Sequence, residues 1–196
     1  MADKGNKTRI KIIQAAKALF IEKGYTAVSM SDLCSATGLS RGGLYRHFSS
    51  TEEVFSSLLT IDKECWEEEM EKAIQVKTSA IQMIKFFFEQ FKKDISENAG
   101  RLSLATYEFE RSGQDKHDFL HKRYESAVNM MERLLRYGQE RGEFSAFEPR
   151  LEADHLTIYL EGLRMTSAAL SFSAEMVAQQ LDYQLNRILK NDGDSQ

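Results

Sequence analysis

The stretch Ser29–Phe48, SMSDLCSATGLSRGGLYRHF, constrains the fold more than any other part of this chain. Ser29 and Asp32 have the S-x-x-D spacing of a capping box, so a helix should begin at residue 30 or 31. Gly38 predicts the end of that helix, because glycine adopts the left-handed conformation at least cost. Ser40 can cap a second helix. The stretch therefore predicts two short helices joined by a tight turn.

The second of these helices has one face that a core does not need. Leu44 and Phe48 are four residues apart, so they share the face that packs on the first helix. Gly42 and Gly43 cost about 1 kcal/mol each in a short helix relative to alanine. Close approach of the helix backbone to DNA would explain both. The face opposite Leu44 and Phe48 carries Arg41, Gly42, Tyr45 and Arg46.

Several short motifs follow one another along the first quarter of the chain. They are Ala15-Ala16-x-x-Leu19-Phe20, Lys23-Gly24-Tyr25, Gly38-Leu39-Ser40 and Leu44-Tyr45-x-His47-Phe48. In this combination, the segment from about Ile10 to Phe55 resembles the DNA-binding domain of the TetR/AcrR family of bacterial transcriptional regulators. Two residues depart from the family pattern. Cys34 replaces a small alanine, and Thr51 stands where many members carry a lysine that contacts a phosphate.

The resemblance implies a homodimeric regulator that binds a palindromic operator in double-stranded DNA. The family resemblance also leads us to expect a repressor that a small hydrophobic ligand releases from its operator. Arg41 and Arg46 are expected at base edges, and His47 at a phosphate. The alternative is a helical interaction or sensor protein that uses the helix-turn-helix for protein contacts. The residues expected to contact DNA are Ser29, Ser40, Arg41, Gly42, Gly43, Tyr45, Arg46 and His47.

Charge is distributed unevenly along the sequence. Residues 1–50 carry a net charge of +5 and residues 51–196 a net charge of −9. A basic end on an acidic body fits contact with a polyanion, although an uneven solvated surface explains the charges alone equally well. No apolar run approaches the roughly 18 residues that span a bilayer, and the first residues do not resemble a signal peptide. We expect a cytoplasmic protein without a membrane partner.

Helical periodicity continues through the rest of the chain. Ser50 and Glu53 repeat the capping-box spacing before a helix that should run to about Val76. We expect disorder in residues 1–7 and a first helix from about Thr8 to Lys23. The sequence predicts an all-α fold of about nine helices, with a helix-turn-helix domain at 1–50 and a larger ligand-binding and dimerisation domain at 51–196. The later helices are expected at 79–98, 102–111, 115–141, 151–170 and 174–189.

Aromatic residues are concentrated in the body, where 10 of the 12 phenylalanines follow residue 50. An aromatic stripe at helical spacing more often forms core than pocket. The resemblance nevertheless implies a small-molecule cavity among the body helices. We expect a largely apolar cavity lined by some of Trp66, Phe87, Phe91, Tyr107, Phe109 and Tyr124.

The last two helices carry leucines that could form either an intramolecular hairpin or a dimer interface. Gly162 is small enough to let another helix come close. A two-fold dimer is what a palindromic operator requires. The residues expected at the interface are Leu156, Tyr159, Leu160, Leu163, Leu181 and Leu185.

The sequence contains no feature that supports catalysis, a cofactor or a metal site. It has no phosphate-binding glycine loop and no nucleophile elbow. His117 and His121 are four residues apart on a predicted helix, but no spacing fixes a third ligand. Cys34 and Cys65 lack C-x-x-C spacing and are expected to be structural thiols among apolar neighbours. We therefore expect a protein that is not an enzyme.

Overall fold

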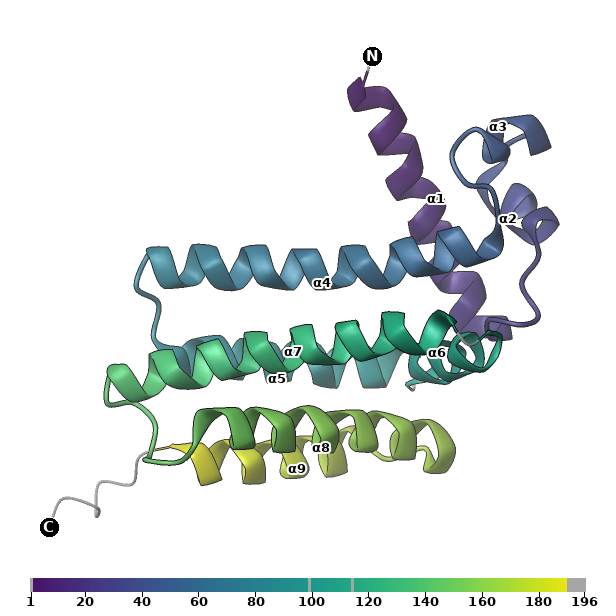
Figure 1. Ribbon diagram of the computed structural model, residues 1–196. Coiled ribbons are helices and arrows are strands. Elements are labelled where there is room, and N and C mark those ends of the chain that lie inside the picture. Colours follow the sequence, from purple (N-terminus) through teal and green to yellow (C-terminus); the bar gives the residue numbers. More distant parts are fainter. Residues whose placement is uncertain (1, 99, 114, 190–196) are drawn as a thin grey trace, which may run out of the picture. The chain divides into compact units, whose positions relative to one another are not determined.

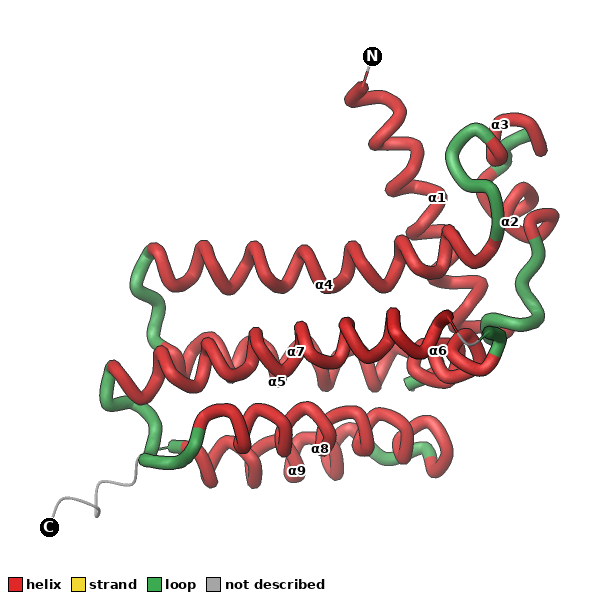
Figure 2. The backbone as a smooth tube through the Cα atoms, in the orientation of Figure 1, coloured by secondary structure: helices red, strands yellow, loops and turns green. Residues whose placement is uncertain are grey.

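The computed structural model describes residues 2–98, 100–113 and 115–189. Apart from one isolated bridge between Phe144 and Leu189, these residues form helices, turns and loops (Figure 2). The expected all-α fold is confirmed. None of the helices in the described ranges is long and apolar enough to cross a membrane. The helices within those ranges are α1 (Ala2–Lys23), α2 (Met30–Thr37), α3 (Arg41–Tyr45), α4 (Thr51–Gln75), α5 (Ala80–Asn98), α6 (Arg101–Arg111), α7 (Asp115–Glu140), α8 (Pro149–Leu170) and α9 (Ala174–Ile188).

Helix α1 begins earlier than expected, at Ala2 instead of Thr8. The expectation of disorder is therefore wrong for residues 2–7. These residues include no proline, and Gly5 has the lowest helix propensity among them. A helix already formed after them can extend backwards, because each added residue gains one hydrogen bond without a new nucleus.

Packing divides the chain into two compact units. The N-terminal unit contains Met1–Cys65 and Arg101–His117, and the C-terminal unit contains Trp66–Gly100 and Asp118–Gln196. This division differs from the boundary expected after residue 50. The reason is that the first part of α4 packs with the helices before it. The Phe55 ring, which is fully buried, lies 4.7 Å from the ring of Phe20 between their centroids.

The N-terminal unit has a small core formed by α1, α2, α3, the start of α4, and α6. Tyr25, just after α1, contributes a ring that lies 5.1 Å from Phe55 and 5.1 Å from Phe109 of α6. Helix α6 therefore belongs to this core although its first residue lies 50 residues after the start of α4. The fully buried side chains of the unit include Ile12, Ala16, Phe20, Leu33, Leu44, Phe48, Val54, Phe55 and Phe109.

The C-terminal unit is a helical bundle in which α5, α7, α8, α9 and the second part of α4 run alongside one another (Figure 1). Polar contacts fix the ends of its helices. Glu143, after α7, accepts hydrogen bonds from Ser79 Oγ at 2.6 Å and from the Ile81 amide at 3.1 Å. The bond from Ile81 satisfies a backbone donor at the start of α5 that lacks a partner within the helix. One cluster of side chains from α4, α5, α7, α8 and α9 forms the core.

Candidate functional site

Helices α2 and α3 adopt the geometry that their capping residues predict. Ser29 accepts a hydrogen bond from the Asp32 amide at 3.2 Å, and Asp32 accepts one from the Ser29 amide at 2.9 Å. This is the predicted capping box. Gly38 ends α2 with φ of 69°, a conformation that glycine adopts without strain. Ser40 Oγ accepts from the Gly43 amide at 3.2 Å and caps α3.

Lys23 joins the end of α1 to the start of α2. Its Nζ lies 2.7 Å from Asp32 Oδ1. The hydrogen bond from Lys23, together with those from Ser29, holds the pKa of the Asp32 carboxyl far below its usual value. The negative charge of Asp32 also lies at the N-terminal end of α2, where the helix dipole favours it.

The outer face of α3 is open to solvent. Arg41, Tyr45 and Arg46 are exposed, and Tyr45 retains 45% of its accessible surface. At Gly42, an added Cβ would meet no heavy atom of the described residues within 4 Å. Packing within the chain therefore does not require glycine at that position. The face offers two cations and a phenol beside a bare stretch of backbone.

Arg9 of α1 holds the C-terminal end of α3 in place. It donates to the His47 carbonyl oxygen at 2.6 Å and to Ser57 Oγ at 3.0 Å. Its guanidinium carbon lies 3.9 Å from the centroid of the Phe48 ring, and its Nη2 lies 3.3 Å from Glu53. Arg9 therefore helps to position α3, a role that no local spacing in the sequence reveals because its partners are 38 or more residues away.

The cap of α4 forms at Ser50 as predicted, but the reciprocal hydrogen bond of the capping box involves the preceding residue. Ser50 Oγ accepts from the Glu53 amide at 3.1 Å, as expected. The Glu53 carboxylate, however, accepts from the Ser49 amide at 2.8 Å and not from that of Ser50. This backbone hydrogen bond, with help from Ser49 Oγ and Arg9, lowers the pKa of Glu53. Thr51 becomes the first residue of α4.

Helix α6 is tied to the end of α1 by Glu108. The Glu108 carboxylate accepts from the Thr26 amide at 3.0 Å and from Thr26 Oγ1 at 3.2 Å. Beyond α6, Lys116 is almost fully buried, and its Nζ lies 2.5 Å from Glu52 in the first turn of α4. The N-terminal unit thus holds α6 and the start of α7 by polar contacts as well as by the Phe109 ring.

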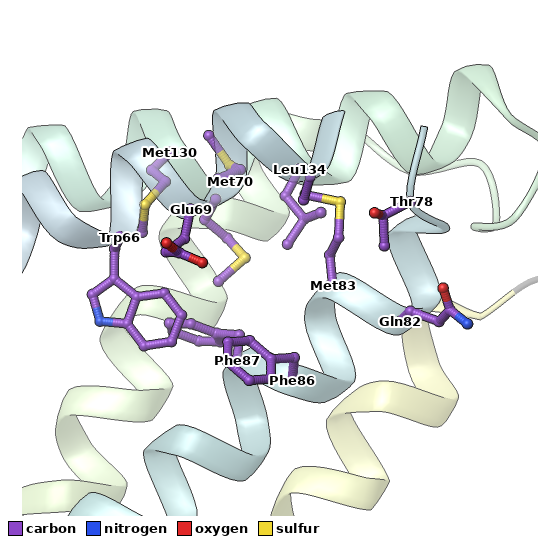
Figure 3. A pocket seen from close by; sticks show the side chains of 12 residues that line it. Trp66, Glu69, Met70, Thr78, Gln82, Met83, Phe86, Phe87, Met130 and Leu134 are labelled. Atoms are coloured by element: carbon purple, nitrogen blue, oxygen red, sulfur yellow. The ribbon is translucent and has the colours of Figure 1, made fainter. Parts of the chain in front are cut away.

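The C-terminal unit contains an apolar cavity of about 290 Å³ (Figure 3). Two hydrogen bonds join α4 to α7 at residues close in sequence to those that line the cavity. Ser126 donates to Glu67 at 3.0 Å, and Arg133 donates to Glu71 at 2.7 Å. The Trp66 and Phe87 rings meet edge to face, with centroids 5.3 Å apart. The lining residues are Trp66, Glu69, Met70, Ala73, Thr78, Gln82, Met83, Phe86, Phe87, Met130, Met131 and Leu134.

Two family descriptions match separate parts of the chain. "Bacterial regulatory proteins, tetR family" matches residues 12–58, which include α2, α3 and the start of α4. "Tetracyclin repressor-like, C-terminal domain" matches residues 82–178, which include most of the C-terminal unit and also α6 of the N-terminal unit. The chain belongs to the TetR family. It is a helix-turn-helix transcriptional regulator, and α2 and α3 form its DNA-binding motif.

Individual TetR-family proteins resemble the chain to different extents. The chain is 29% identical to the uncharacterized HTH-type transcriptional regulator YfiR of Bacillus subtilis over 147 residues, 74% of this chain and 71% of YfiR. It is 37% identical to the HTH-type transcriptional regulator QacR of Staphylococcus aureus over 70 residues, 35% of this chain and 37% of QacR. A TetR-family regulator from Agrobacterium tumefaciens shares the fold, with a TM-score of 0.78 at 16% identity over 95% of this chain and 100% of that one.

Only part of the expected ligand set lies around the cavity of this TetR-family chain. Trp66 and Phe87 line it, whereas Phe91, Tyr107, Phe109 and Tyr124 do not. Phe91 is buried, with the Arg164 guanidinium 4.7 Å from its ring centroid. Tyr124 donates its hydroxyl to Asp154 at 2.9 Å, and burial raises its pKa. Tyr107 and Phe109 lie on α6 and belong to the N-terminal unit.

Sequence reasoning missed the methionines, Glu69 and Phe86 as lining residues. A signal was present, because lining positions recur at three- or four-residue spacing on each helix: 66, 69, 70 and 73 on α4, 82, 83, 86 and 87 on α5, and 130, 131 and 134 on α7. Aromatic residues alone did not mark this face, since several of them fill the cores.

The leucines expected at a dimer interface are buried inside a single chain. Leu156, Leu160, Leu163, Leu181 and Leu185 belong to the core of the C-terminal unit. Tyr159 is half-buried and donates to Gln180 at 2.7 Å. Of the two readings of this leucine pattern, the structure supports the intramolecular hairpin. The same helices also carry exposed apolar side chains, which are Leu151, Ile158 and Leu170 of α8, and Met176 and Tyr183 of α9.

The two cysteines differ in environment. Cys34 is half-buried on α2, whereas Cys65 is exposed, so the expectation of apolar surroundings is wrong for Cys65. Both are free thiols. His117 lies 3.4 Å from Glu110 through its Nδ1. Among the described residues, no group of three histidine, cysteine, aspartate or glutamate side chains is placed to hold a metal ion.

Proposed function

We propose that this regulator is a homodimeric repressor that a small ligand with a largely apolar body releases from a palindromic operator. The observation that carries the proposal is the joint presence of two sites. The exposed face of α3 presents Arg41, Tyr45 and Arg46, and the C-terminal unit holds an apolar cavity of about 290 Å³. Helix α4 contributes residues to both units, so a shift of its cavity-lining residues on ligand binding can be passed along one helix to the DNA-binding unit.

DNA contact is proposed for the same residues that the sequence indicates. Arg41 and Arg46 would reach base edges in the major groove, where arginine pairs with guanine through two hydrogen bonds. Tyr45 and His47 would contact bases or phosphates, and the backbone at Gly42 and Gly43 would lie close to the DNA. Ser29 and Ser40 would contact DNA beside their capping roles. Such a regulator would act in the bacterial cytoplasm, where the chromosome is.

Dimerisation is proposed through α8 and α9. Leu151 and Ile158 are seven residues apart on α8, and Met176 and Tyr183 are seven apart on α9, so each pair shares one face of its helix. At Gly162, an added Cβ would meet no heavy atom of the described residues within 4 Å, which leaves space for another helix. A two-fold dimer would place two copies of α3 about 34–36 Å apart, the spacing of successive major grooves.

DNA binding can be tested with duplexes selected from a random pool. Wild-type protein should select a palindromic sequence, and Arg46→Ala should weaken binding to it by about 1–3 kcal/mol and relax the preference at one base step. Arg111→Ala, which removes an exposed cation from the last turn of α6, is the matched control and should bind normally.

The rival function, protein contact through α2 and α3, predicts a different result. Binding to every duplex would then be weak, and no sequence would be enriched. An Arg46→Ala variant that lost affinity equally for selected and random DNA would show that Arg46 contacts a phosphate instead of a base.

A further inference from the structure

The cavity of the C-terminal unit is lined by charged and polarizable groups that a purely apolar ligand would not need. Besides aliphatic groups, its lining contains three aromatic rings and four thioethers, from Trp66, Phe86, Phe87 and the methionines at 70, 83, 130 and 131. Among the described residues that line it, Glu69 alone carries a charge. A site built for a neutral hydrocarbon gains nothing from a carboxylate, because the carboxylate must stay hydrated.

Glu69 is placed to face a bound ligand. Figure 3 shows its carboxylate beside the Trp66 indole and Met70, on the side of the cavity that the Phe86 and Phe87 rings also line. Its side chain keeps 58% of its accessible surface, so the carboxylate remains hydrated and charged at the edge of the cavity. It therefore needs no buried counter-charge when the cavity is empty.

The existing partner of Glu69 can be released at little cost. Lys72 Nζ lies 3.5 Å from Glu69 and 3.6 Å from Glu68, and the Lys72 side chain is 64% exposed. Exposed pairs of this kind contribute little to stability. If Glu69 turned to a ligand, Lys72 would keep Glu68. By contrast, Glu67 and Glu71 on the same helix are held by Ser126 and Arg133 of α7.

The remaining lining groups favour a positive charge. The faces of aromatic rings attract cations, most strongly where water is partly excluded. Thioether sulfur is polarizable and adapts to bulky groups.

We propose that the cavity selects lipophilic cations, that is, ligands with a positive charge on an aromatic or bulky aliphatic body. Glu69 faces the charge, and the rings of Trp66, Phe86 and Phe87 pack on the body. This inference rests on the proposed function, since it names the class of ligand that would release the operator. A neutral aromatic ligand of the same shape is the alternative that the experiment separates.

Two probes of the same shape isolate the charge. Benzyltrimethylammonium and neopentylbenzene differ by a quaternary nitrogen in place of a carbon. Trp66 is the one tryptophan of the chain, so its fluorescence reports binding in the cavity without a label. Titrations with wild-type protein, Glu69→Gln and Glu68→Gln give the dissociation constants, with calorimetry as a second readout. Glu68→Gln removes the same charge one residue away, from a side chain that does not line the cavity.

The cation should bind wild-type protein, and Glu69→Gln should weaken its binding by about three- to tenfold. Binding of the neutral isostere should be the same in all three proteins, and Glu68→Gln should leave both probes unaffected. The inference is overturned if the cation does not bind, if Glu69→Gln acts no more strongly than Glu68→Gln, or if it weakens both probes equally.

Operator binding separates the failure of this inference from the failure of the proposed function. If the neutral isostere releases the selected operator and Glu69 has no effect, the cation specificity is wrong and the ligand-released repressor stands. If wild-type protein selects no operator, the proposed function is wrong, whichever probe the cavity prefers.

Discussion

At the scale of single residues, Gly42 is the position where stability and DNA binding make opposite demands. Its outward side is empty in the free chain, so Gly42→Ala should raise the free energy of unfolding by about 0.5–1 kcal/mol through helix propensity. The added methyl group should nevertheless weaken operator binding, because it would separate the α3 backbone from the DNA. Denaturant unfolding and a DNA titration measure the two effects on one variant.

Gly38→Ala is the matched control for that substitution. Gly38 also has open space around it, but its φ of 69° strains any other side chain. Gly38→Ala should therefore lower stability. Wild-type operator affinity in Gly42→Ala would contradict the proposed close approach of the backbone.

At the scale of elements, the caps of α2 and α4 predict an acid sensitivity. The pKa of Asp32 is lowered by Lys23 and Ser29, and that of Glu53 by the Ser49 amide and Arg9. Because both pKa values fall on folding, the unfolded chain binds protons first. The stabilisation is complete above the ordinary carboxyl values, about 4, and is lost as the pH falls through the lower folded values.

Glu53→Gln tests this dependence on pH. The variant should be less stable than wild type at pH 7 and should lose less stability than wild type between pH 5 and pH 3. Glu140→Gln, an exposed residue in the last turn of α7, should behave as wild type. Parallel loss of stability with falling pH in wild type and Glu53→Gln would show that Glu53 contributes nothing to the acid transition.

Exposed and buried residues of α8 and α9 allow loss of the dimer to be distinguished from loss of folding. Ile158 is 62% exposed, so Ile158→Glu should produce a folded monomer with weaker operator binding. Val76→Glu changes a residue that is 76% exposed outside these helices and should stay dimeric. Leu163→Glu would place an unpaired charge in the core and unfold the unit. Sedimentation and circular dichroism distinguish these outcomes, and a dimeric Ile158→Glu would place the interface elsewhere.

Local patterns explain why the elements were predictable. Ser29, Gly38 and Ser40 act on residues within one turn of themselves, and their geometry follows the prediction. Arg9 and Phe109 act on residues far away in the sequence, and no spacing encodes those partners. Leu163 shows another reason why sequence prediction is incomplete, because the same apolar periodicity fits a buried hairpin and a dimer interface. Burial of its side chain in the structure supports the hairpin.

At the scale of the whole molecule, release from the operator by a ligand requires energetic coupling between the cavity and the DNA-binding motif. The chain crosses between the two units after Cys65 within α4, after Gly100 and after His117. Each crossing can transmit a change in the C-terminal unit to the residues that hold α3. Coupling of this kind is typically about 1–3 kcal/mol and must act equally in both directions.

Reciprocity provides the most direct test of this coupling. A ligand that binds the cavity is titrated into the protein twice, without DNA and with saturating operator, and its affinity is followed by calorimetry. Operator should weaken ligand binding by about 5- to 150-fold, the same factor by which saturating ligand weakens operator binding. Equal ligand affinity in the two titrations would contradict this coupling and would leave a DNA-binding protein that no ligand in this cavity controls.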